Sequence, residues 1–144
     1  MIPLTIIEAL TPAEQAACFA IRIEVFCREQ KVSRDLEFDG LDGDCRHYLA
    51  RRGTQALGTA RVRPLGEDIV KFERIAVSIR HRGQDIGRAL MDRAIDDAIA
   101  GGAMSGKLNA QVSAGGFYEK LGFVGYGDIF MEAGIEHIAM IRHF

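Results

Sequence analysis

A short turn carries the residues of this 144-residue chain that are best suited to bind an anion: Arg80-His81-Arg82-Gly83-Gln84-Asp85-Ile86-Gly87-Arg88. It follows a segment of β-branched and aromatic residues, 71–77, which predicts a strand. It precedes an amphipathic helix predicted to end before Gly101-Gly102. A glycine turn that opens a helix presents free N–H groups and the positive end of the helix dipole. The basic side chains add positive charge, so the turn predicts a site for a phosphate-bearing ligand.

Two common nucleotide-binding motifs are absent from the sequence. There is no GxxxxGK[ST] segment, and no GxGxxG segment follows a predicted strand. A polar stretch, residues 31–44, carries the acids Glu37, Asp39, Asp42 and Asp44, but it does not follow the EF-hand pattern. We therefore expect no metal site, although polar loops of this length are often functional.

Composition favours one globular domain spanning residues 1–144, since 48% of the residues are hydrophobic. The formal net charge of −2, and the lack of a basic cluster with interleaved aromatics, give no indication of a nucleic-acid partner. No apolar run approaches a signal peptide or a membrane span. Cys18, Cys27 and Cys45 lack metal-type spacing and predict free thiols in a reducing cytoplasm.

The other segments predict the elements that position the turn. Thr11-Pro12-Ala13-Glu14 is a capping box with proline at the first helical position, and it predicts a helix to about Glu29. Ser113 predicts the cap of a second short helix, which contains Gly115-Gly116 and stops at Gly122. Two adjacent glycines destabilise a helix, so their presence needs a reason. Close approach of a ligand or of a neighbouring backbone would supply one. Strands are predicted at 4–9, 46–51, 56–64, 107–112, 123–126, 129–132 and 137–142, which gives an α/β protein.

Two motifs carry a resemblance to a known family. Arg82 to Gly87 resembles the R/Q-x-x-G-x-G/A turn of the GCN5-related N-acetyltransferases (GNAT family), except that Asp85 stands where that family usually has glycine. Gln111-x-x-Ala114-x-x-Phe117-Tyr118-x-Lys120-x-Gly122-Phe123 resembles the family's second signature. Three further segments resemble the ElaA-like branch: Val25-Phe26-Cys27-Arg28-Glu29-Gln30, Asp39-x-x-Asp42-x-x-x-Arg46-His47 and Gly134-Ile135-x-His137-Ile138-x-Met140. The resemblance covers essentially the whole chain.

The resemblance implies a single-domain fold with a central mixed, mostly antiparallel sheet that splays and is flanked by helices. It implies acetyl-coenzyme A as cosubstrate, with its pantetheine arm in the gap of the sheet and its pyrophosphate on the glycine turn. The cofactor-binding residues implied in this way are Ile75, Ala76, Val77, Arg82, Gly83, Gln84, Asp85, Ile86, Gly87, Arg88, Gln111, Ala114, Phe117 and Tyr118.

The resemblance also implies the chemistry: an amine attacks the thioester, an oxyanion forms and the thiolate leaves. The Val77 N–H is the candidate that stabilises the oxyanion. Tyr118 is the candidate proton donor to the departing sulfur, because tyrosine stays protonated at neutral pH. Glu73 is a candidate general base, since period-two alternation predicts that its side chain shares a face with Ile75 and Val77. Glu24, Glu29 and His47 remain alternatives as the base.

Arg22 and Arg74 could contact an acidic group of the substrate or pair with nearby carboxylates, and Glu29 and His47 complete the candidate substrate residues. The acceptor is then an amine of a small molecule or a protein, and the chain is a monomer or a homodimer. Two other functions stay open. Arg22-x-x-Val25-Phe26 with Glu37-x-Asp39-x-x-Asp42 also resembles acyl-homoserine-lactone synthases, although this chain has no tryptophan. A non-catalytic sensor of coenzyme A is the other.

Overall fold

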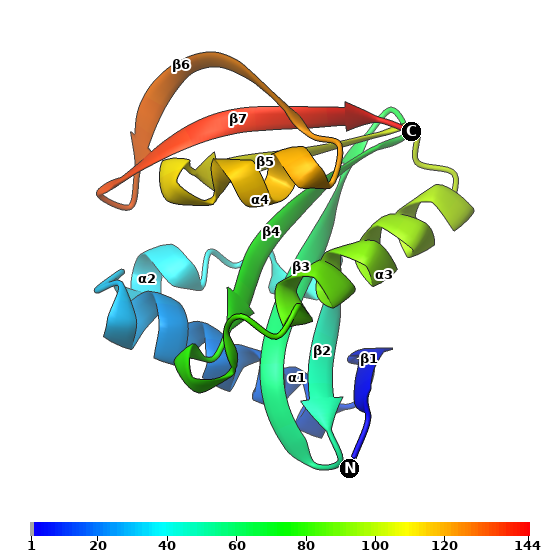
Figure 1. Cartoon of the computed structure of the whole chain (residues 1–144), viewed down its shortest axis with the longest axis vertical. Helices are drawn as coiled ribbons and strands as arrows, with labels where there is room; N and C mark the ends of the chain where they lie inside the picture. Colours follow the sequence, from blue (N-terminus) through cyan, green and yellow to red (C-terminus); the bar gives the residue numbers. More distant parts are fainter. Residues whose placement is uncertain (1) are drawn as a thin grey trace.

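One mixed sheet forms the centre of the protein (Figure 1). The structure is a computed structural model that describes residues 2–144, and within them the strand order is β1-β2-β3-β4-β5-β7-β6. The strands are β1 (Leu4–Glu8), β2 (Arg46–Arg52), β3 (Gln55–Gly66), β4 (Ile69–Val77), β5 (Ser105–Gln111), β6 (Val124–Glu132) and β7 (Ile135–His143). The helices are α1 (Pro12–Arg22), α2 (Arg34–Glu37), α3 (Ile86–Ala100) and α4 (Gly115–Lys120), with short helical turns η1 (Ile23–Glu29), η2 (Asp42–Asp44), η3 (Ile79–His81) and η4 (Val112–Ala114).

The sheet splays at its centre, between β4 and β5. These two strands form the parallel pair of the sheet, and all other neighbours are antiparallel. Their pairing is confined to Ile69–Lys71 against Ser105–Lys107, after which β4 runs away from β5 (Figure 1). The expected mixed, mostly antiparallel and splayed sheet is confirmed.

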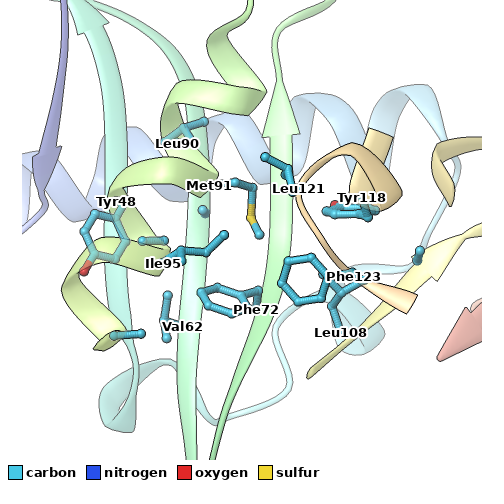
Figure 2. Close-up of a cluster of buried hydrophobic side chains, with 14 of the residues drawn as sticks. Tyr48, Val62, Phe72, Leu90, Met91, Ile95, Leu108, Tyr118, Leu121 and Phe123 are labelled. Atoms are coloured by element: carbon cyan, nitrogen blue, oxygen red, sulfur yellow. The ribbon is translucent and has the colours of Figure 1, made fainter. Parts of the chain in front are cut away.

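Helices cover both faces of the sheet. On one face, Leu90, Met91 and Ile95 of α3 pack with Phe72 and Phe123 in the larger core cluster (Figure 2). On the other face, α1 and η1 pack against β2 and β4 in a second cluster formed by Ala9, Cys18, Ile21, Val25, Leu49 and Ala76. Each face of β4 therefore belongs to a different core.

A β-bulge in β4 changes which side chains share a face. Arg74 has a positive φ of +56°, and the register shifts so that Thr59 faces Ala76 while Arg61 faces Glu73. Ile75 and Val77 pack against the α3 cluster, whereas Ala76 belongs to the α1 cluster. Glu73 lies with Arg61 on the α1 face. The predicted common face for Glu73, Ile75 and Val77 is wrong, because the bulge inserts one residue and reverses the alternation.

The N-terminal helix begins as predicted and then widens. Thr11 Oγ1 accepts from the Glu14 N–H at 3.2 Å, and Glu14 Oε1 accepts from the Thr11 N–H at 3.1 Å, so the capping box is confirmed. The helix is an α-helix only to Arg22, and Ile23–Glu29 continues it as a π-helix. Isolated π-helical turns are frequent at functional sites.

Other local predictions are corrected by the structure. Ser113 does not cap the second short helix: it lies within η4, and Ala114 is the N-cap of α4, without a side-chain hydrogen bond. The polar stretch 31–44 is not a simple loop, since it contains α2 and η2. All three cysteines are free, as predicted. Within residues 2–144, no helix combines the length and the apolar character needed to cross a membrane.

Candidate active site

A cleft of about 610 Å³ lies where β4 and β5 diverge. It is lined by residues of β4, β5, η1, α2 and α4 and by the turn between β6 and β7. Eleven of the predicted site residues line it: Glu73, Arg74, Ile75, Ala76, Val77, Arg82, Gly87, Gln111, Ala114, Phe117 and Tyr118. A smaller hollow of about 210 Å³ at the glycine turn is lined by Gly83, Asp85, Ile86 and Arg88 and shares Val77, Arg82, Gly87 and Phe117 with the cleft. Cleft and hollow therefore adjoin one another.

The glycine turn has the backbone geometry that its sequence implies. Gly83 has a φ of +77°, and Asp85, the N-cap of α3, has a φ of +61°. Aspartate tolerates this left-handed conformation better than most residues, which explains how it replaces a glycine here. Within residues 2–144 the Asp85 carboxylate forms no ion pair, so it is not bound to one of the neighbouring arginines. Gln84 lines neither the cleft nor the hollow, and its Oε1 accepts from Arg52 at 3.1 Å.

Arg82 is held in place from two sides. Its Nε donates to the Val77 C=O at 3.0 Å, and its two terminal nitrogens donate to the Glu29 carboxylate at 2.7 and 2.6 Å. The hydrogen bond from Arg82 is the main cause that lowers the pKa of Glu29. Glu29, predicted as a substrate residue or base, therefore connects the end of the π-helix to the glycine turn and does not line the cleft.

The end of β4 presents backbone groups to the gap. The Ser78 N–H donates to the Leu57 C=O across the β3 side at 2.9 Å. Successive backbone groups of a strand alternate in direction, so the Val77 N–H points the other way, toward β5. Among residues 2–144, no strand pairs with that edge of β4 beyond Lys71. The gap therefore offers strand-like hydrogen bonds to an extended ligand.

Tyr118 lies at the wall of the cleft, on the face of the sheet that α3 covers. The residue is 8% exposed, packs edge-to-face on Phe117 and Phe123, and belongs to the larger core cluster (Figure 2). Its hydroxyl has no hydrogen-bond partner among the residues that the structure describes, yet the residue lines the cleft. Burial raises the pKa of Tyr118, so the hydroxyl keeps its proton at neutral pH.

A buried ionic network forms the other end of the cleft. Arg61 bonds Asp39 at 2.8 Å, Asp42 at 2.9 Å and also Glu73. Arg63 donates to Glu73 at 2.8 and 3.0 Å. Burial alone would raise the pKa of Glu73, but hydrogen bonds from Arg63 and Arg61 outweigh it and lower the pKa. A carboxylate held in this way is a weak proton acceptor, so the geometry counts against Glu73 as the general base.

Besides Glu29, two further predicted substrate residues do not line the cleft. Arg22 is fully buried, lies over the rings of Phe19 and Phe38, and bonds Glu37 and Asp42 at 2.8 and 2.7 Å. The other, His47, is 2% exposed, and its Nε2 lies 2.9 Å from the Asp42 carbonyl. Both are structural residues of the network. Arg74, the bulge residue, does line the cleft and bonds Glu37 at 2.9 Å and Asp39 at 3.3 Å.

The cleft also contains polar residues that the sequence did not mark as site residues. Gln30 Oε1 accepts from Gln111 Nε2 at 2.9 Å, which connects the residue after η1 to the end of β5. Glu132 and His137 line the cleft from β6 and β7. Gln30 and His137 both occur in the ElaA-like segments, and this was the sequence feature from which they could have been predicted as site residues.

The mixed sheet that splays beside a helix-opening glycine turn is the fold of the GNAT class of acetyltransferases. The acetyltransferase (GNAT) domain family matches residues 9–144, and the chain belongs to this family. The N-acetyltransferase YjcF of Bacillus subtilis (strain 168), itself uncharacterized, is 36% identical over 126 residues, 86% of this chain and 89% of its own. Protein ElaA of Escherichia coli (strain K12) is 30% identical over 137 residues, 92% of this chain and 90% of its own.

Solved structures agree with this assignment. An acyl-CoA N-acyltransferase from Pseudomonas aeruginosa has a TM-score of 0.84 and 33% identity, with 99% of both chains covered. Escherichia coli ElaA also has a TM-score of 0.84, with 28% identity and coverage of 99% of this chain and 100% of its own. The protein is therefore an acyltransferase of the GNAT family, similar to the ElaA-like branch.

Proposed function

We propose that the protein binds acetyl-coenzyme A in the cleft and transfers the acetyl group to a primary amine of a small molecule or a protein by direct attack on the thioester. The observation that carries this proposal is that Tyr118, whose hydroxyl has no partner among the described residues, lines the same cleft as the stretch of β4 that has left β5. The site thus combines a ligand channel with a proton donor.

The backbone and the glycine turn account for binding. The edge of β4 at Ile75 and Val77 can hydrogen-bond an extended amide-containing arm as a neighbouring strand does. The free N–H groups at the start of α3 and the positive end of its dipole suit a pyrophosphate. The hollow at the turn adjoins the cleft, since Val77, Arg82 and Phe117 line both. In the Elizabethkingia anophelis acetyltransferase of this family, which has acetyl-CoA bound, the fold is the same at 20% identity and a TM-score of 0.73.

The reaction follows from the groups beside the thioester. The Val77 N–H stabilises the oxyanion that forms when the amine attacks. Tyr118 donates a proton to the sulfur as the C–S bond breaks. Burial raises the pKa of Tyr118, so its hydroxyl is protonated at neutral pH, and no described residue competes for that proton. Three free cysteines further favour a cytoplasmic location, where thiols stay reduced.

Tyr118→Phe tests the proposal, because it removes the donor and keeps the ring. With acetyl-coenzyme A and a panel of primary amines, followed by release of free thiol, kcat should fall by about 100-fold or more. In calorimetry with a chelator present, Tyr118→Phe should bind coenzyme A with nearly the same affinity as the wild type. Tyr126→Phe is the matched control, since Tyr126 is an exposed residue of the edge strand β6 and does not line the cleft.

The outcomes separate the alternatives. An unchanged kcat in Tyr118→Phe, where chemistry limits turnover, would return Tyr118 to a packing role. Binding of coenzyme A without turnover of any amine would favour the sensor. Turnover that depends on S-adenosylmethionine would favour the lactone synthase, whose resemblance includes Arg22, Glu37 and Asp42. These residues are occupied in the buried network.

A further inference from the structure

His137 of β7 has the geometry of a proton acceptor at the acceptor side of the cleft. The residue is 6% exposed but lines the cleft, and its ring stacks on Phe130 at a centroid distance of 6.0 Å. Its Nδ1 lies 2.7 Å from the Ile135 carbonyl oxygen. A carbonyl can only accept, so Nδ1 carries the proton and the neutral ring keeps its lone pair on Nε2.

The strand register places His137 level with the proposed thioester site. Lys71 is paired with Lys107 where the two strands begin to diverge. Counting on from this pair, and leaving out the one residue that the bulge adds to β4, Ala76 comes level with Gln111. Gln111 faces His137 directly across β5 and β7. His137 therefore lies at the height of the end of β4, where the acyl group is expected.

His137 and Tyr118 approach the cleft from opposite faces of the sheet. Cross-strand partners share a face, and the Gln111 side chain reaches Gln30 on the η1 side. Tyr118 belongs to the core cluster on the α3 side. An amine that enters from the η1 side therefore meets His137, while the sulfur leaves toward Tyr118 and the glycine turn.

Glu132 supplies an exit for a proton taken up by the ring. Its Oε2 lies 3.6 Å from His137 Nε2, and its side chain is 48% exposed. The neighbours on β5, Asn109 and Gln111, are neutral, and Phe130 covers one ring face. Among the described residues, Glu132 is the charged group in contact with the ring.

On the basis of the proposed function, we infer that His137 is the general base that takes the proton from the acceptor ammonium. The ammonium gives one proton to Nε2, which passes it through Glu132 to solvent. The free amine then forms the N–C bond and the C–S bond breaks. Tyr118 gives a proton to the thiolate and regains one from the nitrogen that has become the amide.

His137→Asn is the test, since an amide can still donate to the Ile135 carbonyl but cannot accept a proton. With benzylamine as acceptor, kcat/KM at neutral pH should fall by about 100-fold or more, with acetyl-coenzyme A affinity retained. In the wild type the rate should fall on acidification as His137 protonates, and the variant should lose this limb. Added imidazole should restore part of the rate, and a weakly basic amine that is already unprotonated should be much less affected. His143→Asn, an exposed position of the same strand, is the control.

The results distinguish this inference from the proposed function. If the wild type releases no thiol with any amine, the proposed function fails and the inference fails with it. If the wild type turns over and His137→Asn keeps its rate and its pH profile, only the inference is overturned. If His137→Asn does not fold, Glu132→Gln decides, because it removes the carboxylate that passes the proton to solvent. Its kcat/KM with benzylamine should fall while that with a weakly basic amine changes little, and an unchanged kcat/KM with benzylamine would overturn the assignment.

Discussion

Arg61→Met tests the buried ionic network at the end of the cleft with one substitution. The Arg61 side chain is 1% exposed and bonds the carboxylates of Asp39, Asp42 and Glu73. Methionine keeps an apolar stem of related shape but removes the cation. Three carboxylates then remain in a largely buried site with less positive charge around them, so we expect a large loss of stability.

The structure sets the size of this loss. Removing one partner of a buried ion pair costs about 3–5 kcal/mol. Each of the three carboxylates keeps a second arginine, at 3.3, 2.7 and 2.8 Å: Arg74 for Asp39, Arg22 for Asp42 and Arg63 for Glu73. We therefore expect the lower end, about 3 kcal/mol in the free energy of unfolding at pH 7. For a chain of this size that corresponds to a decrease in Tm of about 10 °C.

The same reasoning predicts how the loss depends on pH. Hydrogen bonds from Arg61 are the main cause that lowers the pKa of Asp39, and the pKa of Asp42 and Glu73 is lowered despite burial, through their arginine partners. A carboxyl whose pKa is lower in the folded state contributes stability above its unfolded pKa, and this contribution is lost as the pH falls. The difference between wild type and variant should therefore be largest near pH 7 and shrink below about pH 4.

Urea unfolding at pH 7, 5 and about 3 measures both effects. Arg63→Met is the matched control, because the Arg63 side chain is 27% exposed and bonds Glu73 alone. Its removal should cost about 1 kcal/mol or less. Equal losses for the two variants, or a difference that does not change with pH, would refute the assignment of Arg61 as the centre of the network.

Asp85→Gly should leave the fold intact and tighten coenzyme A binding severalfold in low-salt calorimetry, because glycine adopts a φ of +61° readily and a carboxylate leaves the phosphate site. Strongly weakened binding would show that Asp85 organises the turn. Gly116→Ala should raise the free energy of unfolding by about 0.5–1 kcal/mol, since a Cβ there meets no described atom within 4 Å. If this glycine leaves room for the ligand, the same variant should bind coenzyme A more weakly, and an unchanged affinity would contradict that role. Under non-oxidising conditions a thiol reagent should detect three free cysteines after denaturation, with buried Cys18 protected before it, and a disulfide would contradict the cytoplasmic proposal.

The elements with local signals were predictable from the sequence. The capping box at Thr11 and Glu14, the stop of α3 at Gly101 and the glycine turn each depend on residues within one helical turn of one another. The two family signatures add the order of the strands and the splay between β4 and β5. In these cases the residues that specify the structure are close in the chain.

The partners of the charged residues were not predictable, because they depend on contacts between distant segments. Arg22 and His47 have side chains of a kind that often contacts substrates, but α1 and β2 direct them into the protein. Nothing in the sequence around Arg61 indicates an ionic role, although this residue lies at the centre of the network. His137 was visible only as part of a motif, and its role follows from the cleft that β7 lines.

The bulge at Arg74 connects these observations. A bulge bends its strand and increases the local twist, and this one lies in β4 just beyond Lys71, where pairing with β5 ends. The extra residue turns Ile75 and Val77 toward the α3 side and leaves Glu73 in the ionic network on the other. It also directs the Arg74 side chain onto Glu37. Since no glycine marks the left-handed position, a strand of regular alternation was the natural prediction. One inserted residue thus separates the edge that is suited to the thioester from the charged wall that is suited to the acceptor.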